Sequence, residues 1–359
     1  MLEIVESSPV RVKPACAFYN KCGGCNLQHI EYNAQLKIKE NILKDSFLRI
    51  GGIEPSQSKQ NTQIEVFSSS PFEYRNRMQF HCLRGLAKNS DSRKYGLKGR
   101  KSSEIIAVSD CPVAVSGIRE LLTSFSPRSA DLNINSFALP VEKDRFTVFS
   151  KDSVLLSEGG QQRGKIKLLD KEITVDSGIF FQSNCVMLEK LILQLREIAK
   201  EAAKSDSAAE SNGTGRNFSM ADLYCGAGTY ALFLSDLFPK IILAEENKNA
   251  VSLARENLKG IDAEYFALRD TEWQKTIFKE KTAFGFVVVD PPRAGLAQKL
   301  ALTLAQSKIP VIAYVSCDPA SLARDAKILM NGGYDLTALK LFDFYPQTAH
   351  IESLAVFER

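Results

Sequence analysis

Cysteine spacing near the amino terminus is the first feature of this sequence that indicates chemistry. Three cysteines follow one another in the run CAFYNKCGGCNLQH with the spacing C-x5-C-x2-C, and a fourth stands far downstream in SDCPV. Thiolates gathered on a glycine-bearing loop can bind an iron–sulfur cluster or a zinc ion. The pattern lacks the paired C-x2-C knuckles of a zinc finger, so it favours a cluster, with an incidental loop of reduced thiols as the alternative. The four residues are Cys16, Cys22, Cys25 and Cys111.

A glycine-rich turn in the carboxyl-terminal half indicates a cofactor site. The strand-like segment MADLYC runs into Gly226 and Gly228, which begin the pattern G-x-G-x-x-A. Glycine at a strand-to-helix junction lets the backbone turn tightly and approach a ligand closely. Glu245 ends the next expected strand, where a carboxylate can accept both hydroxyls of a ribose. The spacing predicts a nucleotide-type cofactor, for which NAD and S-adenosylmethionine fit equally well, with tight packing as the alternative.

Two further polar side chains follow later expected strands. The run VVVDPPR places Asp290 at the carboxyl end of one strand, and VSCDP places Cys317 at the end of the next. Ligands of open α/β sheets bind outside these strand ends. A dehydrogenase has no evident need for a cysteine there, whereas a methyltransferase that must activate a carbon atom does. The pair therefore favours methyl transfer, the alternatives being a buried structural cysteine and an aspartate that caps a turn.

The composition indicates a reducing compartment. The chain has 359 residues, which predicts two or three domains, and eight cysteines, which we expect to be free thiols or metal ligands. The first residues lack the apolar core of a signal peptide, and no apolar run approaches the roughly 20 residues of a membrane span. We therefore expect a cytoplasmic protein without membrane contact.

Positive charge is concentrated in one window. The net charge is only +4, but the segment 75–101 holds nine basic residues and one acid, with Tyr74, Phe80 and Tyr95 in or beside it. Localised cations interleaved with aromatic rings suit a phosphate backbone with bases to stack on. The window is our candidate RNA surface, and a solvated loop face is the alternative.

The order of apolar segments predicts an α/β protein of three parts. Residues 1–67 form the cysteine segment and a helix ended by Gly51 and Gly52, and residues 68–165 alternate apolar and polar as in an antiparallel sheet. Residues 166–359 alternate strands and helices as a Rossmann-like domain, with a flexible loop expected at Ser205–Arg216.

Six motifs occur in order over nearly the whole chain: CAFYNKCGGCNLQH, FFQSN, DLYCGAG, DPPRAGL, VSCDPASLARD and YPQTAHIES. The set closely resembles the bacterial RNA uracil-5-methyltransferases, the family that makes 5-methyluridine in ribosomal and transfer RNA. The resemblance implies a Rossmann-like S-adenosylmethionine domain, a cluster-bearing segment and an RNA substrate. Thr229 departs from the asparagine of many relatives, and the small RNA-binding barrel of longer members has no room before Cys16.

The resemblance also implies residue roles. Cys16, Cys22, Cys25 and Cys111 match the ligands of a [4Fe-4S] cluster. Cys317 matches the nucleophile and Glu352 the base. Matches to the S-adenosylmethionine contacts are Gln182, Tyr224, Glu245 and Asp290, which join Gly226 and Gly228 of the glycine turn.

The chemistry expected from these roles is covalent catalysis. A thiolate that adds to C6 of uracil makes C5 nucleophilic, so that C5 can attack the methyl group on the sulfonium of S-adenosylmethionine. A carboxylate then removes the C5 proton so that the thiol can be eliminated. The target must leave its stack, so we expect a flipped uridine from an RNA loop.

Three alternatives follow from the same residues: another RNA as the substrate, and two other classes of protein. The sequence favours 23S rRNA over tRNA as the substrate, and we expect a monomer. A radical or redox enzyme built on the cluster is a different class, although its usual spacing is C-x3-C-x2-C. A non-catalytic RNA-binding protein is the last, and Cys317 with Glu352 argues against it.

Overall fold

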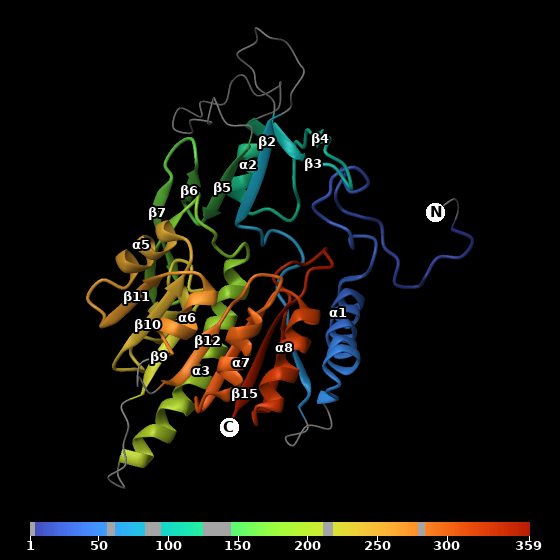
Figure 1. Ribbon diagram of the computed structural model, residues 1–359. Helices are drawn as coiled ribbons and strands as arrows, with labels where there is room; N and C mark the ends of the chain where they lie inside the picture. The colour runs from blue at the N-terminus through green and yellow to red at the C-terminus, as the bar shows by residue number, and fades with distance from the viewer. Residues whose placement is uncertain (1–3, 56–61, 83–94, 125–144, 211–217, 279–283) are drawn as a thin grey trace.

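One large mixed sheet with helices on both faces forms the centre of the molecule (Figure 1). This computed structural model describes residues 4–55, 62–82, 95–124, 145–210, 218–278 and 284–359. Within these ranges no helix has the length and apolar character needed to cross a membrane. Four cations of the basic window lie outside the described residues: Arg84, Lys88, Arg93 and Lys94.

The large sheet has eight strands in the order β1-β14-β15-β13-β12-β9-β10-β11. Neighbours are parallel except where β15 runs antiparallel between β14 and β13. The run FGFVVV of β12 is buried at every residue, as expected for a parallel strand covered on both faces. The strands are β1 (Ile64–Phe67), β9 (Ser219–Leu223), β10 (Ile241–Glu245), β11 (Ala263–Ala267), β12 (Phe284–Val289), β13 (Val311–Ser316), β14 (Asp335–Phe342) and β15 (Glu352–Glu358).

Helices enclose a separate hydrophobic core on each face of this sheet. On one face α3, α4 and α5 pack with the hairpin β7–β8, and Leu188, Leu191 and Leu195 of α3 are buried as their spacing predicts. On the other face η1, α6, α7 and α8 bury Phe47 and Trp273. The elements are α1 (Tyr32–Ser46), η1 (Phe47–Gly51, a π-helix), α3 (Cys185–Glu210), α4 (Thr229–Leu234), α5 (Lys248–Asn257), α6 (Asp270–Thr276), α7 (Gln298–Gln306), α8 (Pro319–Asn331), β7 (Arg163–Leu168) and β8 (Lys171–Asp176).

A smaller antiparallel sheet lies beyond the carboxyl-terminal edge of the large one (Figure 1). Its strand order is β4-β3-β2-β5-β6, so the antiparallel sheet expected within 68–165 is present. Helix α2 covers it, and Phe80, Ile118 and Phe146 form part of its core. The elements are β2 (Arg77–Cys82), β3 (Tyr95–Lys98), β4 (Ile105–Ile106), α2 (Ser116–Ser124), β5 (Arg145–Lys151) and β6 (Val154–Ser157).

The loop expected at Ser205–Arg216 is wrong over its first part. Residues 205–210 continue α3, which ends at Glu210, and residues 211–217 lie outside the described chain. The segment SDSAAE contains alanine and glutamate, which have high helix propensity, so the helix continues past the serines that suggested a loop.

Helix α1 is fixed to the loop before β15 by buried polar contacts. Lys39 Nζ lies 2.5 Å from Asp343 Oδ1, and both side chains are buried. Lys39 also donates to the carbonyl oxygen of Tyr345 at 3.0 Å, and the Tyr32 hydroxyl donates to Asp343 Oδ2 at 2.8 Å. A buried ion pair needs such additional hydrogen bonds to offset the loss of hydration. The amino-terminal helix therefore holds the chain that leads into Glu352.

Candidate active site

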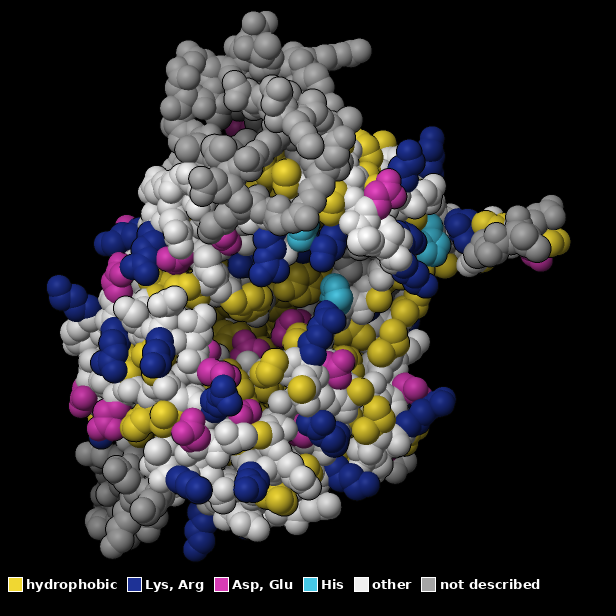
Figure 2. Space-filling model, turned by 45° about the horizontal axis from the view of Figure 1, so that its top comes forward, with side chains coloured by type: hydrophobic (Ala, Val, Ile, Leu, Met, Phe, Trp, Pro, Cys, Tyr) yellow, Lys and Arg dark blue, Asp and Glu magenta, His cyan; other side chains and the backbone are white. Residues whose placement is uncertain are grey.

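A cavity of about 870 Å³ opens at the edge of the large sheet where the parallel strands end. Figure 2 shows a hollow with acidic and hydrophobic side chains at its bottom and Lys, Arg and His side chains around its rim. Strand ends supply many of its walls, since Tyr224 follows β9, Glu245 ends β10, Asp290 follows β12 and Cys317 follows β13. The position is the one that open α/β sheets use for ligands.

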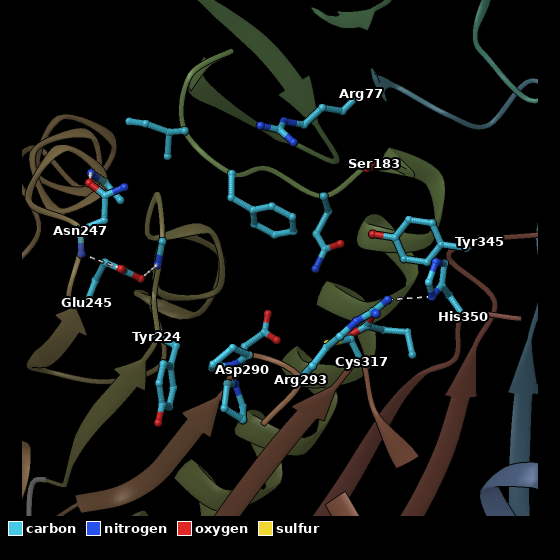
Figure 3. A pocket seen from close by; sticks show the side chains of 18 of the residues that line it. Arg77, Ser183, Tyr224, Glu245, Asn247, Asp290, Arg293, Cys317, Tyr345 and His350 are labelled. Atoms are coloured by element: carbon cyan, nitrogen blue, oxygen red, sulfur yellow. Dashed lines mark hydrogen bonds between the residues drawn. The ribbon is translucent and has the colours of Figure 1, made fainter. Parts of the chain in front are cut away.

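Two ends of this cavity can be distinguished in Figure 3. Tyr224, Glu245 and Asn247 lie at one end, which we call the cofactor half together with Gly226 and Asp270. Arg293, Cys317, Tyr345 and His350 lie at the other end, which we call the acceptor half together with Glu352. Asp290 lies between the two halves.

The glycine turn leaves open space in the cofactor half. Gly226 has φ 52°, and no atom lies within 4 Å of the position that a Cβ would take. Gly228 has φ 76°, and a Cβ there would lie 2.7 Å from Leu258 Cδ1. Gly226 therefore keeps the cavity free for a ligand, whereas Gly228 lies behind the cavity and lets α4 begin against α5.

Backbone amides orient the carboxylate of Glu245. Its Oε2 accepts from the amide of Gly226 at 3.3 Å, and its Oε1 accepts from the amide of Asn247 at 2.8 Å. A carboxylate held in this way keeps lone pairs that can accept from hydroxyl groups of a ligand.

Tyr224 is supported by two residues that the sequence reasoning missed. Its hydroxyl donates to Asp270 Oδ2 at 2.8 Å, and its ring meets that of Trp273 edge to face at 4.6 Å between centroids. Both residues line the cavity from the short helix α6. The only signal in the sequence was an acid followed by a tryptophan after an expected strand, and no motif accompanied it.

Two buried polar atoms on residues that line the cavity lack hydrogen-bond partners. They are Oε1 of Gln182 and Nε of Arg77. The guanidinium carbon of Arg77 lies 5.8 Å from the ring centroid of Phe180, a cavity residue whose side chain is largely exposed. Buried polar groups are normally satisfied, so these atoms are where we expect a ligand or water to bind.

The antiparallel strand β15 brings Glu352 to Cys317. Ser316 at the end of β13 pairs with Ser353 near the start of β15. Because β15 runs against its neighbours, its first residue lies at the edge where β13 and β14 end. Glu352 is buried, and Cys317 is partly exposed to the cavity. The sheet topology thus places a thiol beside a carboxyl group.

Burial and mutual repulsion set the protonation of this cluster. Burial, Glu352 and Asp290 raise the pKa of Cys317 to about 11, against the lowering effect of Arg293. Burial raises the pKa of Asp290 to about 7, while the Tyr230 hydroxyl donates to its Oδ2 at 3.1 Å. Burial and Asp290 also raise the pKa of Glu352. These shifts favour a protonated thiol and carboxyl groups that retain protons near neutral pH.

Arg293 and His350 form a hydrogen-bonded pair beside the thiol. The distance from Arg293 Nη2 to His350 Nδ1 is 2.8 Å, and arginine can only donate, so Nδ1 is the acceptor. Burial, Arg293 and Arg75 lower the pKa of His350, which agrees with a neutral ring. His350 is thus a support for Arg293 rather than an acid.

The cysteine loop forms part of the cavity wall without its thiols. Gly23 and Gly24, which stand between Cys22 and Cys25, line the cavity. The loop is tied to the end of β3, because the amide of Gly23 donates to the carbonyl oxygen of Lys98 at 2.9 Å. It is also tied to the loop before β15, where the amides of Asn26 and Leu27 donate to the carbonyl oxygen of Gln347 at 3.1 and 3.0 Å.

The four predicted ligand cysteines lie in one neighbourhood. All eight cysteines are free thiols. After the larger effect of burial, Cys25 and Cys16 raise the pKa of Cys111, which reaches about 12, and Cys22 raises the pKa of Cys16 and Cys25. Such mutual effects require proximity. Across the described ranges, however, no three His, Cys, Asp or Glu side chains converge closely enough to hold one metal ion.

Comparisons with known proteins define the family. The model of the tRNA (uracil-5-)-methyltransferase family matches residues 176–359. An uncharacterized RNA methyltransferase of Treponema denticola is 33% identical over 382 residues, covering 99% of this chain and 86% of the relative. The 23S rRNA (uracil(1939)-C(5))-methyltransferase of Aliivibrio salmonicida is 26% identical, and the match covers 100% of this chain and 85% of that enzyme.

A solved structure has the same fold. The tRNA (uracil-54, C5)-methyltransferase of Pyrococcus abyssi, crystallised with S-adenosyl-L-homocysteine, superposes with a TM-score of 0.71 at 24% identity. The match covers 99% of this chain and 88% of that one. The chain therefore has a mixed α/β methyltransferase fold and belongs to the tRNA (uracil-5-)-methyltransferase family. It is an S-adenosylmethionine-dependent RNA uracil-5-methyltransferase.

Proposed function

We propose that Cys317 and Glu352 carry the covalent chemistry of uracil C5 methylation in this enzyme. The observation that supports it is their meeting in the acceptor half, opposite the glycine turn, through the antiparallel placement of β15. A thiol and a carboxyl group at one end of a cavity, with cofactor space at the other, are what methyl transfer to a carbon requires.

The reaction divides into three steps. Sγ of Cys317 loses its proton to solvent and adds as a thiolate to C6 of uracil, and the displaced electron pair makes C5 a nucleophile. C5 then attacks the methyl group that S-adenosylmethionine would supply, and the electron pair of the broken bond stays on sulfur in the departing S-adenosylhomocysteine. Glu352 removes the C5 proton, the electron pair returns to the C5–C6 bond, and the thiolate of Cys317 leaves.

Charge within the cavity controls the first and last steps. The raised pKa values of Cys317 and Glu352 favour the protonated form of both groups. A positive charge near Asp290 favours the ionised forms of Cys317, Glu352 and Asp290. A carboxylate whose pKa is raised by burial is also the stronger base once it ionises.

The cofactor half contains groups that suit S-adenosylmethionine. Gly226 leaves room for the ligand, Glu245 offers its carboxylate to ribose hydroxyls, and Tyr224 forms a rigid wall. The unpaired Oε1 of Gln182 can accept from the ligand, and Asp290 can face its positive end. These residues fit the cofactor, so we assign them to its binding.

We also propose that Cys16, Cys22, Cys25 and Cys111 bind a [4Fe-4S] cluster. Four free thiols in one neighbourhood form the usual donor set of such a cluster. A four-iron cluster is larger than a single ion, so its ligands do not need to converge on one point. Its role would be structural, since methyl transfer from a sulfonium needs no electron.

The proposed substrate is a flipped uridine in 23S rRNA. It is supported by the likeness of this whole chain to 85% of the Aliivibrio salmonicida enzyme, whose name states that RNA. In this proposal residues 1–67 hold the cluster, residues 68–165 bind RNA, and residues 166–359 catalyse the reaction as a cytoplasmic monomer. The RNA must expose the base, because within a stack C6 is not accessible to the thiol, nor C5 to the methyl group.

Methyl transfer with labelled cofactor tests this function. Purified enzyme is incubated with radiolabelled S-adenosylmethionine and with unmodified 23S rRNA or unmodified tRNA in parallel, and nucleosides are then separated. We expect labelled 5-methyluridine from 23S rRNA. Label confined to tRNA would show that tRNA, not 23S rRNA, is the substrate. If protein that retains its iron labels neither RNA, the result would contradict the proposed function.

A further inference from the structure

A second hollow lies on the other side of the cysteine loop from the acceptor half. It has a volume of about 470 Å³ and lies between that loop and the strands β2 and β3. It shares Gly23, Gly24 and Arg75 with the catalytic cavity, so one turn of chain separates the two. Its other lining residues include Gln79, His81, Leu97, Lys98, Arg100 and Lys101.

The charge of this hollow, which we call the flanking groove, is of one sign. Arg75, Lys98, Arg100 and Lys101 line it, and none of its described lining residues is acidic. Within the described chain no acid forms a salt bridge with Lys98 or Lys101, and both are exposed. Cations without acidic partners around a concave surface favour a phosphate ligand.

One of these cations is held in place rather than free. Arg100 Nη2 donates to the carbonyl oxygens of Cys25 at 2.8 Å and Tyr19 at 3.1 Å, and its guanidinium lies 4.9 Å from the Tyr19 ring centroid. Its position is therefore preorganised, whereas the two lysines can move toward a bound strand.

The strand β2 gives the groove a side that suits a base. Met78 and Phe80 point into the core of the small sheet, so the alternating Gln79 and His81 face outward. The Gln79 amide offers a donor and an acceptor. Burial, Lys98 and Arg145 lower the pKa of His81, so its neutral ring also offers one of each. Partly buried Leu97 adds apolar surface.

We propose that the flanking groove binds a second nucleotide of the RNA strand whose uridine enters the catalytic cavity. The lysines and arginines hold its phosphate, and Gln79 and His81 contact the edge of its base. The groove and the catalytic cavity share Gly23, Gly24 and Arg75, so only a short length of RNA strand separates their ligands. At about 3.4 Å or more per nucleotide, the second nucleotide should lie within about three of the target. This inference rests on the proposed function and makes the groove a determinant of which uridine is chosen.

Photo-crosslinking on a trapped complex tests the proposal. The photoreactive residue p-benzoylphenylalanine replaces Gln79, and the protein with S-adenosylmethionine is mixed with 23S rRNA or tRNA transcripts containing 5-fluorouridine. Fluorine cannot leave as a proton, so the adduct at Cys317 marks the target. After irradiation, primer extension locates both attachment points.

The expected crosslink lies within about three nucleotides of the adduct. An adduct without a crosslink, or with one at a distant nucleotide, would overturn the proposal. Absence of any adduct would instead count against the proposed function. The same photoreactive residue at Leu302, exposed on α7, is the control and should not crosslink near the target.

Charge substitution gives a second test. The double variant Lys98→Ala with Lys101→Ala should weaken RNA binding and reduce the slope of log affinity against log salt by about two, one for each phosphate contact. The matched variant Lys299→Ala with Lys327→Ala, on α7 and α8, should leave the slope unchanged. Equal slopes for the two double variants would show that the groove is only a solvated cationic face and would overturn the proposal.

Discussion

The cofactor half and the acceptor half of the cavity are assembled in different ways. Most of the cofactor half comes from a short stretch of chain, in which Tyr224, Gly226 and Glu245 belong to one strand–helix–strand unit. The acceptor half combines Arg293, Cys317 and Glu352, which follow or begin separate strands. A local motif can specify the first half, whereas the second exists only once the sheet has formed.

The acceptor half also depends on the amino terminus. Helix α1 supplies Lys39 to Asp343, and the cysteine loop holds Gln347, so both fix the loop that precedes Glu352. The amino-terminal segment thus contacts the loop that leads into Glu352, the proposed base. This difference predicts that changes in the cysteine segment affect covalent chemistry more than cofactor binding.

The largest effect should come from Cys317→Ala. Removal of a nucleophile costs roughly 10⁶-fold in turnover in other covalent enzymes, so methylation should fall below detection. Cofactor binding, measured by calorimetry, should stay within a few-fold because the cofactor half is unchanged. Substantial residual methylation would refute the role of the thiol.

Glu352→Gln should stall the reaction at elimination. Turnover should fall by roughly 10²–10⁴-fold, the usual contribution of a general base. Addition and methyl transfer still proceed, so a covalent complex with ordinary RNA should accumulate on denaturing gels. If the variant is slow but no covalent complex accumulates, a residue other than Glu352 removes the C5 proton.

Lys39→Met should lower the free energy of unfolding, because it breaks the ion pair that fixes the loop leading into the acceptor half. It leaves the Asp343 carboxylate buried without its charged partner, which costs about 3–5 kcal/mol in urea unfolding. Lys37→Met on the same helix is the control, since Lys37 pairs with Glu40 at the surface and should change stability by less than about 0.5 kcal/mol.

The folded Lys39→Met protein sharpens the comparison further. Its adduct formation with 5-fluorouridine RNA should slow more than its cofactor binding weakens. Equal losses for the Lys39 and Lys37 variants would contradict the link between α1 and the loop before β15.

The smallest effect concerns how the alkylation rate of Cys317 depends on pH. Only the thiolate reacts with iodoacetamide, and burial, Glu352 and Asp290 raise the pKa of the Cys317 thiol to about 11. Alkylation of Cys317, followed by peptide mass spectrometry, should therefore accelerate about tenfold per pH unit from neutral pH upward. Glu352→Gln removes a repelling charge and should accelerate alkylation at a fixed alkaline pH. A plateau close to neutral pH would show that the thiol ionises readily.

The fold could be predicted where the sequence has local periodicity or a motif. The glycine turn and the apolar stripe of α3 follow from spacing, and both are present. The meeting of Cys317 with Glu352 came only from the resemblance, because nothing local states that β15 is antiparallel.

The residues that sequence reasoning missed depend on distant partners. Asp270 and Trp273 contact Tyr224 from a short helix with no motif of its own. Lys39 looks like a surface lysine until the fold brings it to Asp343, 304 positions away. Arg77 belonged to the basic window, but its burial beside Phe180 required the position of β2.

The central claim is that Cys317 forms a covalent bond to the target uridine. The most direct measurement is mass spectrometry of peptides from enzyme trapped with S-adenosylmethionine and 5-fluorouridine RNA after nuclease digestion. We predict a methylated fluorouridine nucleotide attached to the peptide that contains Cys317. Attachment to another cysteine, or an enzyme that methylates RNA yet yields no adduct, would contradict the account.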